Sequence, residues 1–394
     1  GGGGSDPNLD TNSGVLSRLT WNGSSWDKVD LVRGLPRCEE NHSTNGMALS
    51  GNTLLVQSGG HTNKGAPSNN FAGTPEYFLS GVLLSIDLAQ LNSMPVYTDP
   101  RSGVQYVYDL PTLNDPSRPD ITKASPNFPY PVGHPMRDAT IDEGDPFGGN
   151  NSLNQAFAEA GGPVSIQSFG YRNAYDVVIT QDGHIFTGDN GPNTGWGGQP
   201  IIYNANGTVK GVQGQNGVTF NPGAGDYITN DFNESQSNGH GDPLHYVGPL
   251  GSPNGSYYAG HPKAIQAFPS RAKIIVYEKS GSNWIATQQY NLADLLGNVS
   301  GYFSSSYDIS DFPDRPTEGE YLADNNQPNK INIIDIVNSS TNGMAEYTAS
   351  NFNGALQGDL LTASFNGKIN RYKLANDKTT AIIDEVLFQG FGNT

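Results

Sequence analysis

A cation, an amide and several oxygen ligands flank one predicted hairpin in the middle of the sequence. Residues 176–180 and 184–189 alternate in polarity and are rich in β-branched and aromatic side chains, and a Gln-Asp-Gly turn separates them. Arg172 and Asn173 precede the first strand, and the run Asp189-Asn-Gly-Pro192 follows the second. An antiparallel hairpin brings its outer ends together, so we expect these groups to share one edge of a sheet. That edge is the predicted functional site.

The plan of the central hairpin, a polar loop followed by strand, Gly turn and strand, occurs twice more. Residues 43–48 and 340–345 both read Ser-Thr-Asn-Gly-Met-Ala, and a strand-turn-strand pattern follows each copy. His42 lies in the loop before the first copy, and His61 lies in the Gly-rich loop after its second strand. Recurring units of this kind are typical of a β-propeller, whose loops meet around a central channel. The repeat therefore predicts that both histidines lie on the same rim as Arg172.

Composition favours one large all-β domain. The 394 residues are enough for two ordinary domains, but 50 Gly and 26 Pro interrupt short apolar runs, and sustained helical periodicity is scarce. Residues 152–160 are the segment that could form a short helix, and residues 240–245 read as a loop. We expect a Gly-rich linker or tail over residues 1–12 and a single β-propeller domain over residues 13–394.

The charge pattern excludes two classes of partner. The chain has 21 Lys and Arg against 38 Asp and Glu, a formal net charge of −17, and contains no basic tract. Nucleic acids and anionic membrane surfaces are therefore excluded as partners. No apolar run approaches the ~18 residues of a membrane span. The acidity suits either a soluble extracellular surface or oxygen ligands for a metal such as Ca²⁺. We expect a secreted, cell-surface or periplasmic protein.

Several motifs occur in the order found in one enzyme family. They are His42 followed by Asn-Gly-Met-Ala-Leu at 45–49, Tyr-Arg-Asn at 171–173, Asp-Asn-Gly-Pro at 189–192 and Gly-Asp-Leu-Leu at 358–361. From about residue 31 onward the chain resembles the glucose/sorbosone dehydrogenase-like family of soluble quinoproteins. The resemblance implies a six-bladed β-propeller, here with long loop insertions, that holds pyrroloquinoline quinone (PQQ) over Ca²⁺. It also implies oxidation of a sugar hydroxyl by hydride transfer to PQQ.

The resemblance assigns roles to individual residues. His42 would be the general base, for which an imidazole suits because its ordinary pKa lies near neutral pH. Arg172 would stabilise the negative charge of the reduced cofactor together with Asn173. The remaining candidates are Tyr175, His61 and Arg371 for the cofactor, and the carbonyls of Gly191 and Pro192 with Asp189 for calcium.

Departures from the family pattern keep a second function open. Residues 193–198 contain no carboxylate where the calcium-binding members have acidic residues, and Asn366 stands where a cofactor-contacting Lys is expected. The alternative is a non-catalytic extracellular propeller that binds a glycan or a protein, as one module of a longer cell-surface polypeptide. Arg172 could then simply pair with a nearby carboxylate, and His42 could be a surface residue. After the last predicted strand, either the N-terminal strand completes the final blade or the propeller is incomplete at its C-terminal end; we favour the second.

Overall fold

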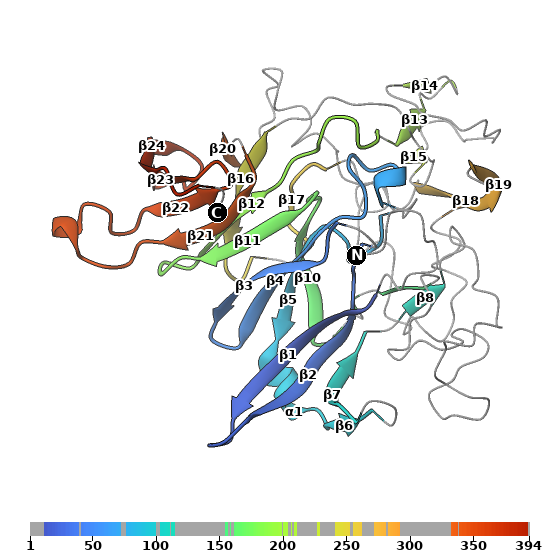
Figure 1. Cartoon of the computed structure of the whole chain (residues 1–394), viewed down its shortest axis with the longest axis horizontal. Coiled ribbons are helices and arrows are strands. Elements are labelled where there is room, and N and C mark those ends of the chain that lie inside the picture. The colour runs from blue at the N-terminus through green and yellow to red at the C-terminus, as the bar shows by residue number, and fades with distance from the viewer. Residues whose placement is uncertain are drawn as a thin grey trace.

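The protein, here in a computed structural model, is built mainly of β-strands arranged in antiparallel and mixed sheets (Figure 1). The structure describes residues 12–38, 41–71, 76–99, 103–110, 112–114, 154–156, 158, 161–198, 200–203, 206, 209–210, 227–228, 241–252, 255–261, 272–280, 283–291, 332–337 and 339–392. Of the predicted N-terminal tail, residues 1–11 lie outside these ranges. The all-β prediction is confirmed at this level.

Four of the sheets are each named here after the strand that comes first in the sequence. The β1 sheet contains β1 (Gly14–Trp21), β2 (Trp26–Leu35), β7 (Gln105–Asp109) and β6 (Tyr97–Thr98). The β3 sheet contains β17 (Tyr257–Tyr258), β10 (Val164–Phe169), β5 (Val82–Asp87), β4 (Thr53–Ser58) and β3 (Thr44–Ser50). The β11 sheet contains β11 (Ala174–Ile179), β12 (His184–Asp189), β16 (Asp242–Pro249) and β20 (Ile333–Val337). The β21 sheet contains β21 (Thr341–Glu346), β22 (Leu360–Ser364), β23 (Lys368–Leu374) and β24 (Ala381–Gln389).

Two further sheets and three short helical segments complete the described elements. One sheet contains β14 (Val209–Lys210), β13 (Ile201–Tyr203), β15 (Tyr227–Ile228), β18 (Ala272–Ser280) and β19 (Asn283–Asn291). The other pairs β8 (Thr112–Asn114) with β9 (Asn154–Ala156). The helical segments are α1 (Leu88–Ser93), η1 (Asn69–Phe71) and η4 (Phe352–Gly354). Within the described residues, no helix has the length and apolar character needed to cross a bilayer.

Consecutive sheets pack face to face. Buried side chains between the β3 and β11 sheets include Leu55, Val177 and Ile185, and those between the β11 and β21 sheets include Phe186 and Tyr372. The first strands β3, β11 and β21 lie next to one another, with β11 between the other two (Figure 1). The loops at the ends of these three strands are therefore brought to a common region.

The two copies of the Ser-Thr-Asn-Gly-Met-Ala repeat form the matching strands β3 and β21, which flank β11. In the first copy, Gly46 packs directly on Asp176 of β11. In the second copy, the amide of Met344 donates a hydrogen bond of 2.7 Å to Asp176 Oδ2. The two copies thus contact Asp176 from opposite sides. The repeated residues form the two strands that pack against β11.

Replacing Gly46 by alanine is expected to destabilise the protein by about 1–3 kcal/mol, because the added carbon overpacks the contact between β3 and β11. An ideal Cβ at Gly46 would lie 2.5 Å from Asp176 Oδ1 and 2.7 Å from its Cα. Gly343, at the same place in the second copy, is the matched control, since its nearest neighbour would be Ala363 Cβ at 3.6 Å. Denaturant unfolding of both variants measures the difference, and equal losses would contradict the packing described.

Two local predictions need correction. Residues 152–160 were expected to include a short helix, but Asn154–Ala156 is the strand β9, which pairs antiparallel with β8. Of the predicted loop at 240–245, residue 240 lies outside the described ranges and residues 242–245 begin the strand β16. The helix α1 has only six residues and is capped by Asp87, which accepts a hydrogen bond from the Gln90 amide; it is too short to show helical periodicity in the sequence.

Candidate functional site

A cavity of about 680 Å³ lies where the loops of the β3, β11 and β21 sheets meet. This volume is in the range of small-molecule sites. Its lining comes from segments far apart in the sequence: Asn41, His42, Arg172, Asn173, Tyr175, Asn190, Gly191, Pro192, Asn193, Thr194, Trp196, Gly241, Asp242, Ser339, Ser340, Asn342 and Phe365. Six predicted site residues are therefore brought together: His42, Arg172, Asn173, Tyr175, Gly191 and Pro192.

The imidazole of His42 is held in one tautomer. Its Nδ1 lies 2.6 Å from the carbonyl oxygen of Gly60, and because a carbonyl only accepts, Nδ1 carries the proton. The ring also packs edge-on against Phe71. Burial, and next the positive charge of Arg172, lowers the pKa of His42 well below its ordinary value. At neutral pH the ring is therefore uncharged, with the lone pair on Nε2 ready to accept a proton.

Arg172 is 2% exposed, and its guanidinium donates hydrogen bonds to two oxygen atoms near the cavity. Nε donates to Asn63 Oδ1 and Nη1 donates to the carbonyl of Asn190, both at 3.2 Å. Trp196 lies beside it, with the ring centroid 6.0 Å from Cζ. A planar cation fixed at the edge of a cavity is suited to bind a negatively charged or electron-rich oxygen.

Asp189 holds the Arg172-Asn173 turn in place. Its two carboxylate oxygens accept hydrogen bonds from the backbone amides of Arg172 (2.9 Å) and Asn173 (2.7 Å), and the residue is fully buried. The sequence prediction gave Asp189 a role as a calcium ligand. In the structure its oxygens join the two ends of the hairpin and Asp189 is not part of the cavity lining, and its role toward calcium stays a prediction.

Gly59 allows His42 and Asn173 to approach each other. An ideal Cβ at this position would lie 2.6 Å from Asn173 Oδ1 and 2.7 Å from His42 Cβ. The amide of Asn45 donates to the same Asn173 oxygen at 2.9 Å, which orients that side chain. Only a residue without a side chain fits between the His42 side chain and the Asn173 amide.

Asp242 connects the loop after β12 to the loop before β21, and both loops line the cavity. One of its carboxylate oxygens accepts from the amide of Gly191 at 2.8 Å, and the other accepts from the amide of Ser340. Burial raises the pKa of Asp242. The sequence offered a signal in the His-Gly-Asp-Pro-Leu-His run at 240–245, but the run was interpreted as loop packing and Asp242 was missed.

Two predicted cofactor residues do not reach the cavity lining. His61 is fully buried, and its ring packs edge-on against Tyr77 at 4.9 Å. Arg371 lies on β23, where its guanidinium pairs with Asp359 at 2.6 Å and Glu385 at 2.8 Å and donates to the carbonyl of Ala355. Arg371 was a candidate for the cofactor, and the register of β23 places it among these acceptors.

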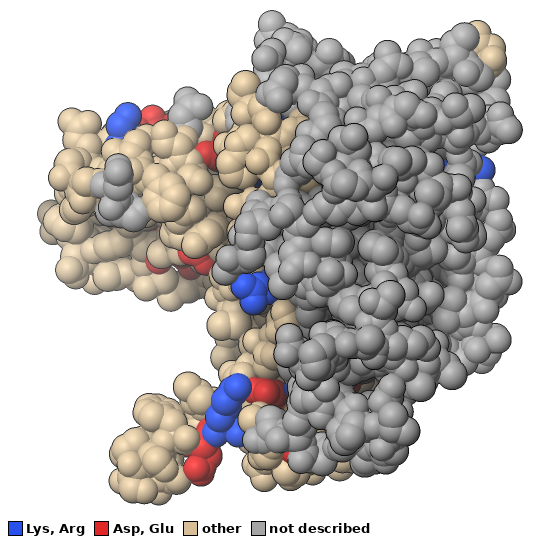
Figure 2. Space-filling model, turned by 45° about the vertical axis from the view of Figure 1, so that its right-hand side comes forward, with Lys and Arg blue, Asp and Glu red and all other residues tan. Residues whose placement is uncertain are grey.

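The part of the chain that the structure describes contains no group of three or more His, Cys, Asp or Glu side chains arranged to hold a metal ion. The oxygen donors predicted for calcium that do line the cavity are those of Gly191 and Pro192. Among the described residues in view in Figure 2, Lys, Arg, Asp and Glu are scattered between uncharged residues.

Because His245 is buried, the free energy of unfolding is expected to depend on pH. His245 is fully buried, with Nδ1 2.7 Å from the hydroxyl of Tyr257, and burial lowers its pKa to about 3. Since the unfolded chain has a histidine pKa of about 6.5, this residue contributes stability above pH 6.5 that is lost as the pH falls toward 3. Urea unfolding at pH 7 and pH 5 should show the wild type losing about 2 kcal/mol more than His245→Gln over this interval. Parallel losses in the two proteins would contradict a neutral buried His245.

Comparison with known proteins gives limited similarity. No protein-family model and no curated protein sequence matches the chain. Among solved structures, one similar chain is the holo form of the PQQ domain of pyranose dehydrogenase from Coprinopsis cinerea. It shares 9% sequence identity with a TM-score of 0.35, and the match covers 96% of this chain. The chain spans 64% of the length of that structure.

Proposed function

We propose that this chain is a six-bladed β-propeller whose cavity binds a sugar and, with PQQ, oxidises one of its hydroxyl groups. The observation that carries the proposal is the neutral His42 imidazole, fixed at Nδ1 by Gly60, on the wall of a cavity that also presents the guanidinium of Arg172. A base without charge beside a fixed cation is the arrangement that removal of a hydroxyl proton requires.

The propeller part of the proposal is supported by the order of the sheets. The β3, β11 and β21 sheets pack in succession, their first strands lie side by side, and two of these strands have the same six-residue repeat. In a propeller the first strand of each blade lies nearest the axis. A cavity at the ends of β3, β11 and β21 would then lie at the mouth of the central channel.

His42 would accept the hydroxyl proton on Nε2. The proton on Nδ1 remains with the Gly60 carbonyl, so the ring becomes a cation only while it holds the substrate proton. The hydroxyl carbon gives up its hydrogen with two electrons and becomes a carbonyl carbon. Bound PQQ supplies the electron-accepting quinone for this hydride. The nearby charge of Arg172 favours return of the proton to solvent, because it lowers the pKa of His42.

The described lining fits one part of PQQ better than another. Arg172 and Asn173 lie together and can bind the quinone oxygens, and the carbonyls of Gly191 and Pro192 are oxygen donors of the kind that Ca²⁺ prefers. Within the described lining, however, Arg172 is the single Lys or Arg, whereas PQQ is a tricarboxylate. The described lining thus offers a positive charge to the quinone oxygens of PQQ, but too few positive charges for its three carboxylates.

The shortage of positive charges for the PQQ carboxylates favours a second function, the binding of a glycan without oxidation. The lining is rich in amides, hydroxyls and aromatic rings, including Asn342, Ser340, Trp196 and Phe365. Such groups bind neutral polyhydroxylated ligands through hydrogen bonds and ring contacts. In this case His42 would act as a hydrogen-bond acceptor for a sugar hydroxyl, and the chain would be a recognition module of an extracellular protein.

Reconstitution separates the two functions. The purified chain is titrated with PQQ in the presence of Ca²⁺ and followed by the absorbance of the cofactor, and turnover is then assayed with a panel of aldoses and a dye acceptor. Binding of PQQ with turnover supports the dehydrogenase. Sugar binding measured by calorimetry without any PQQ binding supports the recognition module. Neither PQQ nor sugar binding would overturn both.

A further inference from the structure

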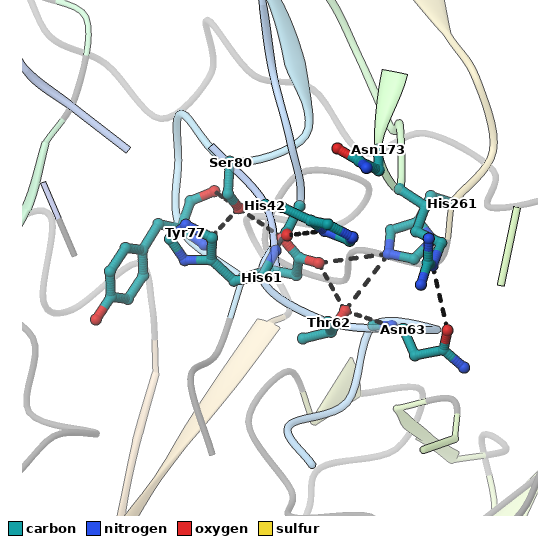
Figure 3. A network of polar contacts seen from close by, with 12 residues as sticks. His42, His61, Thr62, Asn63, Tyr77, Ser80, Asn173 and His261 are labelled. Atoms are coloured by element: carbon teal, nitrogen blue, oxygen red, sulfur yellow. Dashed lines mark hydrogen bonds and ion pairs between the residues drawn. The ribbon is translucent and has the colours of Figure 1, made fainter. Parts of the chain in front are cut away.

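The cavity has a buried inner end that is held in place from behind. His42 and Arg172, which line it, are 6% and 2% exposed. Nδ1 of His42 bonds the carbonyl of Gly60. The next residue, His61, donates its amide to the buried carboxylate of Glu76 at 3.1 Å (Figure 3). Because a buried carboxylate that accepts hydrogen bonds is costly to move, the inner end is a fixed polar surface.

The outer end of the cavity carries two exposed aromatic residues. Tyr175 and Phe365 both line the cavity and are 40% and 48% exposed. Single exposed apolar side chains are common on protein surfaces and by themselves indicate nothing. Two of them on one cavity whose described lining is otherwise mostly polar provide a place where the apolar face of a ligand can pack.

A β-bulge places Tyr175 at the cavity. On the hairpin of β11 and β12, Ala174 pairs with Asp189 and Asp176 pairs with Gly188. Tyr175 is therefore an extra residue on β11, with no counterpart on β12. Bulges are frequent beside binding sites, because the extra residue breaks the strand alternation and re-aims a side chain.

The two neighbouring first strands have a register shift at the corresponding place, and there the residue is asparagine. On β21 the extra residue is Asn342, and on β3 the shift contains Asn45. Both asparagines make hydrogen bonds within the protein. Asn45 donates to Asn173 Oδ1 at 2.9 Å, and Asn342 Oδ1 accepts from Asn190 at 3.4 Å. On β11 the same position instead presents the exposed ring of Tyr175.

Phe365 is held at the cavity by its backbone. It lies in the turn between β22 and β23, and its amide donates to the carbonyls of Ser339 at 3.0 Å and Ser340 at 3.2 Å. The amide of Ser340 in turn donates to Asp242, which also accepts from the amide of Gly191. The turn that carries the ring of Phe365 is thus attached to the cavity wall.

We propose that Tyr175 is a specificity-determining residue and that the ligand is a glycan chain, whose end unit enters the cavity while its second unit packs on the rings of Tyr175 and Phe365. A pyranose ring has hydroxyl groups at its edge and C–H bonds on its faces, so its faces pack against the electron-rich face of an aromatic ring. The inference rests on the proposed function in that the cavity binds a sugar. It gives Tyr175 a different ligand from the cofactor that the sequence predicted.

The test replaces Tyr175 by the residue that the neighbouring strands have. Tyr175→Asn removes the ring and is compatible with the bulge, because asparagine occupies the corresponding place in β3 and β21. Calorimetric titration of the wild type should give disaccharides of the aldose panel an affinity about tenfold higher than that of the corresponding monosaccharides. In Tyr175→Asn the two affinities should agree within about threefold.

Two control variants separate the ring from other effects. Tyr175→Phe keeps the ring and loses the hydroxyl, so it should retain the preference for disaccharides. Tyr97→Asn makes the asparagine replacement at a 50% exposed tyrosine of β6 that does not line the cavity, and it should also retain the preference. Loss of the preference in either control, to the same extent as in Tyr175→Asn, would overturn the inference.

A measurement on the wild-type chain decides the case even if Tyr175→Asn does not fold. When the aromatic protons of the protein are saturated in an NMR experiment, the saturation should reach the protons of the second sugar unit of a bound disaccharide. Transfer to the first unit alone would show that the second unit does not contact the rings, and the inference would be wrong.

The outcomes also separate this inference from the proposed function. Binding of monosaccharides with no gain from a second unit overturns the role of Tyr175 and leaves the proposed function standing. Binding of no saccharide of any length overturns both. If Tyr175→Asn weakens PQQ binding and leaves the preference for disaccharides unchanged, Tyr175 serves the cofactor and the inference fails.

Discussion

Replacing His42 by glutamine is expected to lower the rate of sugar oxidation by the PQQ-loaded protein about 10²- to 10⁴-fold, the usual contribution of a general base. Glutamine has a similar reach and can still donate to the Gly60 carbonyl, but it has no basic nitrogen at the place of Nε2. Sugar and PQQ affinities should change by about threefold or less, since the loss lies in the proton-transfer step. Steady-state kinetics with a dye acceptor, together with calorimetric affinities, measure the two effects.

His184→Gln is the control for this experiment. His184 lies at the start of β12 beside the hairpin turn, with Nδ1 2.8 Å from the hydroxyl of Tyr246, and it does not line the cavity. Its replacement should leave turnover unchanged. If His42→Gln retains wild-type turnover, His42 is not the base. If it loses sugar affinity in proportion to rate, His42 serves binding and the recognition function gains support.

Replacing Arg172 by methionine is expected to weaken PQQ binding about 10²-fold or more. Methionine keeps much of the side-chain volume but removes the buried charge and the hydrogen bonds to Asn63 and Asn190. Truncating one partner of a desolvated charged contact costs about 2–5 kcal/mol, which converts to a loss in affinity of about 30-fold to 4,000-fold, and the expected loss lies within this range. Titration of PQQ absorbance gives the dissociation constants.

Arg371→Met is the matched control, because both arginines are held by several acceptors but only Arg172 lines the cavity. Arg371→Met should lower the unfolding midpoint, since it breaks the contacts with Asp359 and Glu385, and should leave the PQQ dissociation constant within about threefold of wild type. A loss of PQQ affinity in Arg371→Met equal to that in Arg172→Met would restore the sequence-based assignment of Arg371 and contradict the site described.

Local patterns were sufficient for most of the strands near the site. The alternation at 176–180 and 184–189 gave the hairpin β11–β12 to within two residues. Short-range signals succeed here because strand alternation and glycine turns are properties of neighbouring residues. The β11 sheet was harder, since β16 and β20 join it from residues 242–249 and 333–337 after long intervening segments.

The sequence also predicted which residues meet in part of the candidate site. An arginine and an asparagine before one strand and an Asp-Asn-Gly-Pro run after its partner must meet, because antiparallel pairing closes the hairpin at that end. The repeat at 43–48 then placed His42 near them, and the structure has His42, Arg172 and Asn173 on one cavity. The functional roles given to these residues remain predictions until the experiments above are done.

The sequence by itself determined the chemical groups, the strands and the hairpin that carries Arg172 and Asn173. Only the tertiary structure decided that Asp189 binds backbone amides, that Arg371 lies among other acceptors, and that Asn63 supports the cation from 109 positions away. The reason is physical. Contacts across so many residues are set by how sheets pack on one another, and no local pattern of side chains encodes which polar atoms that packing brings within hydrogen-bonding distance.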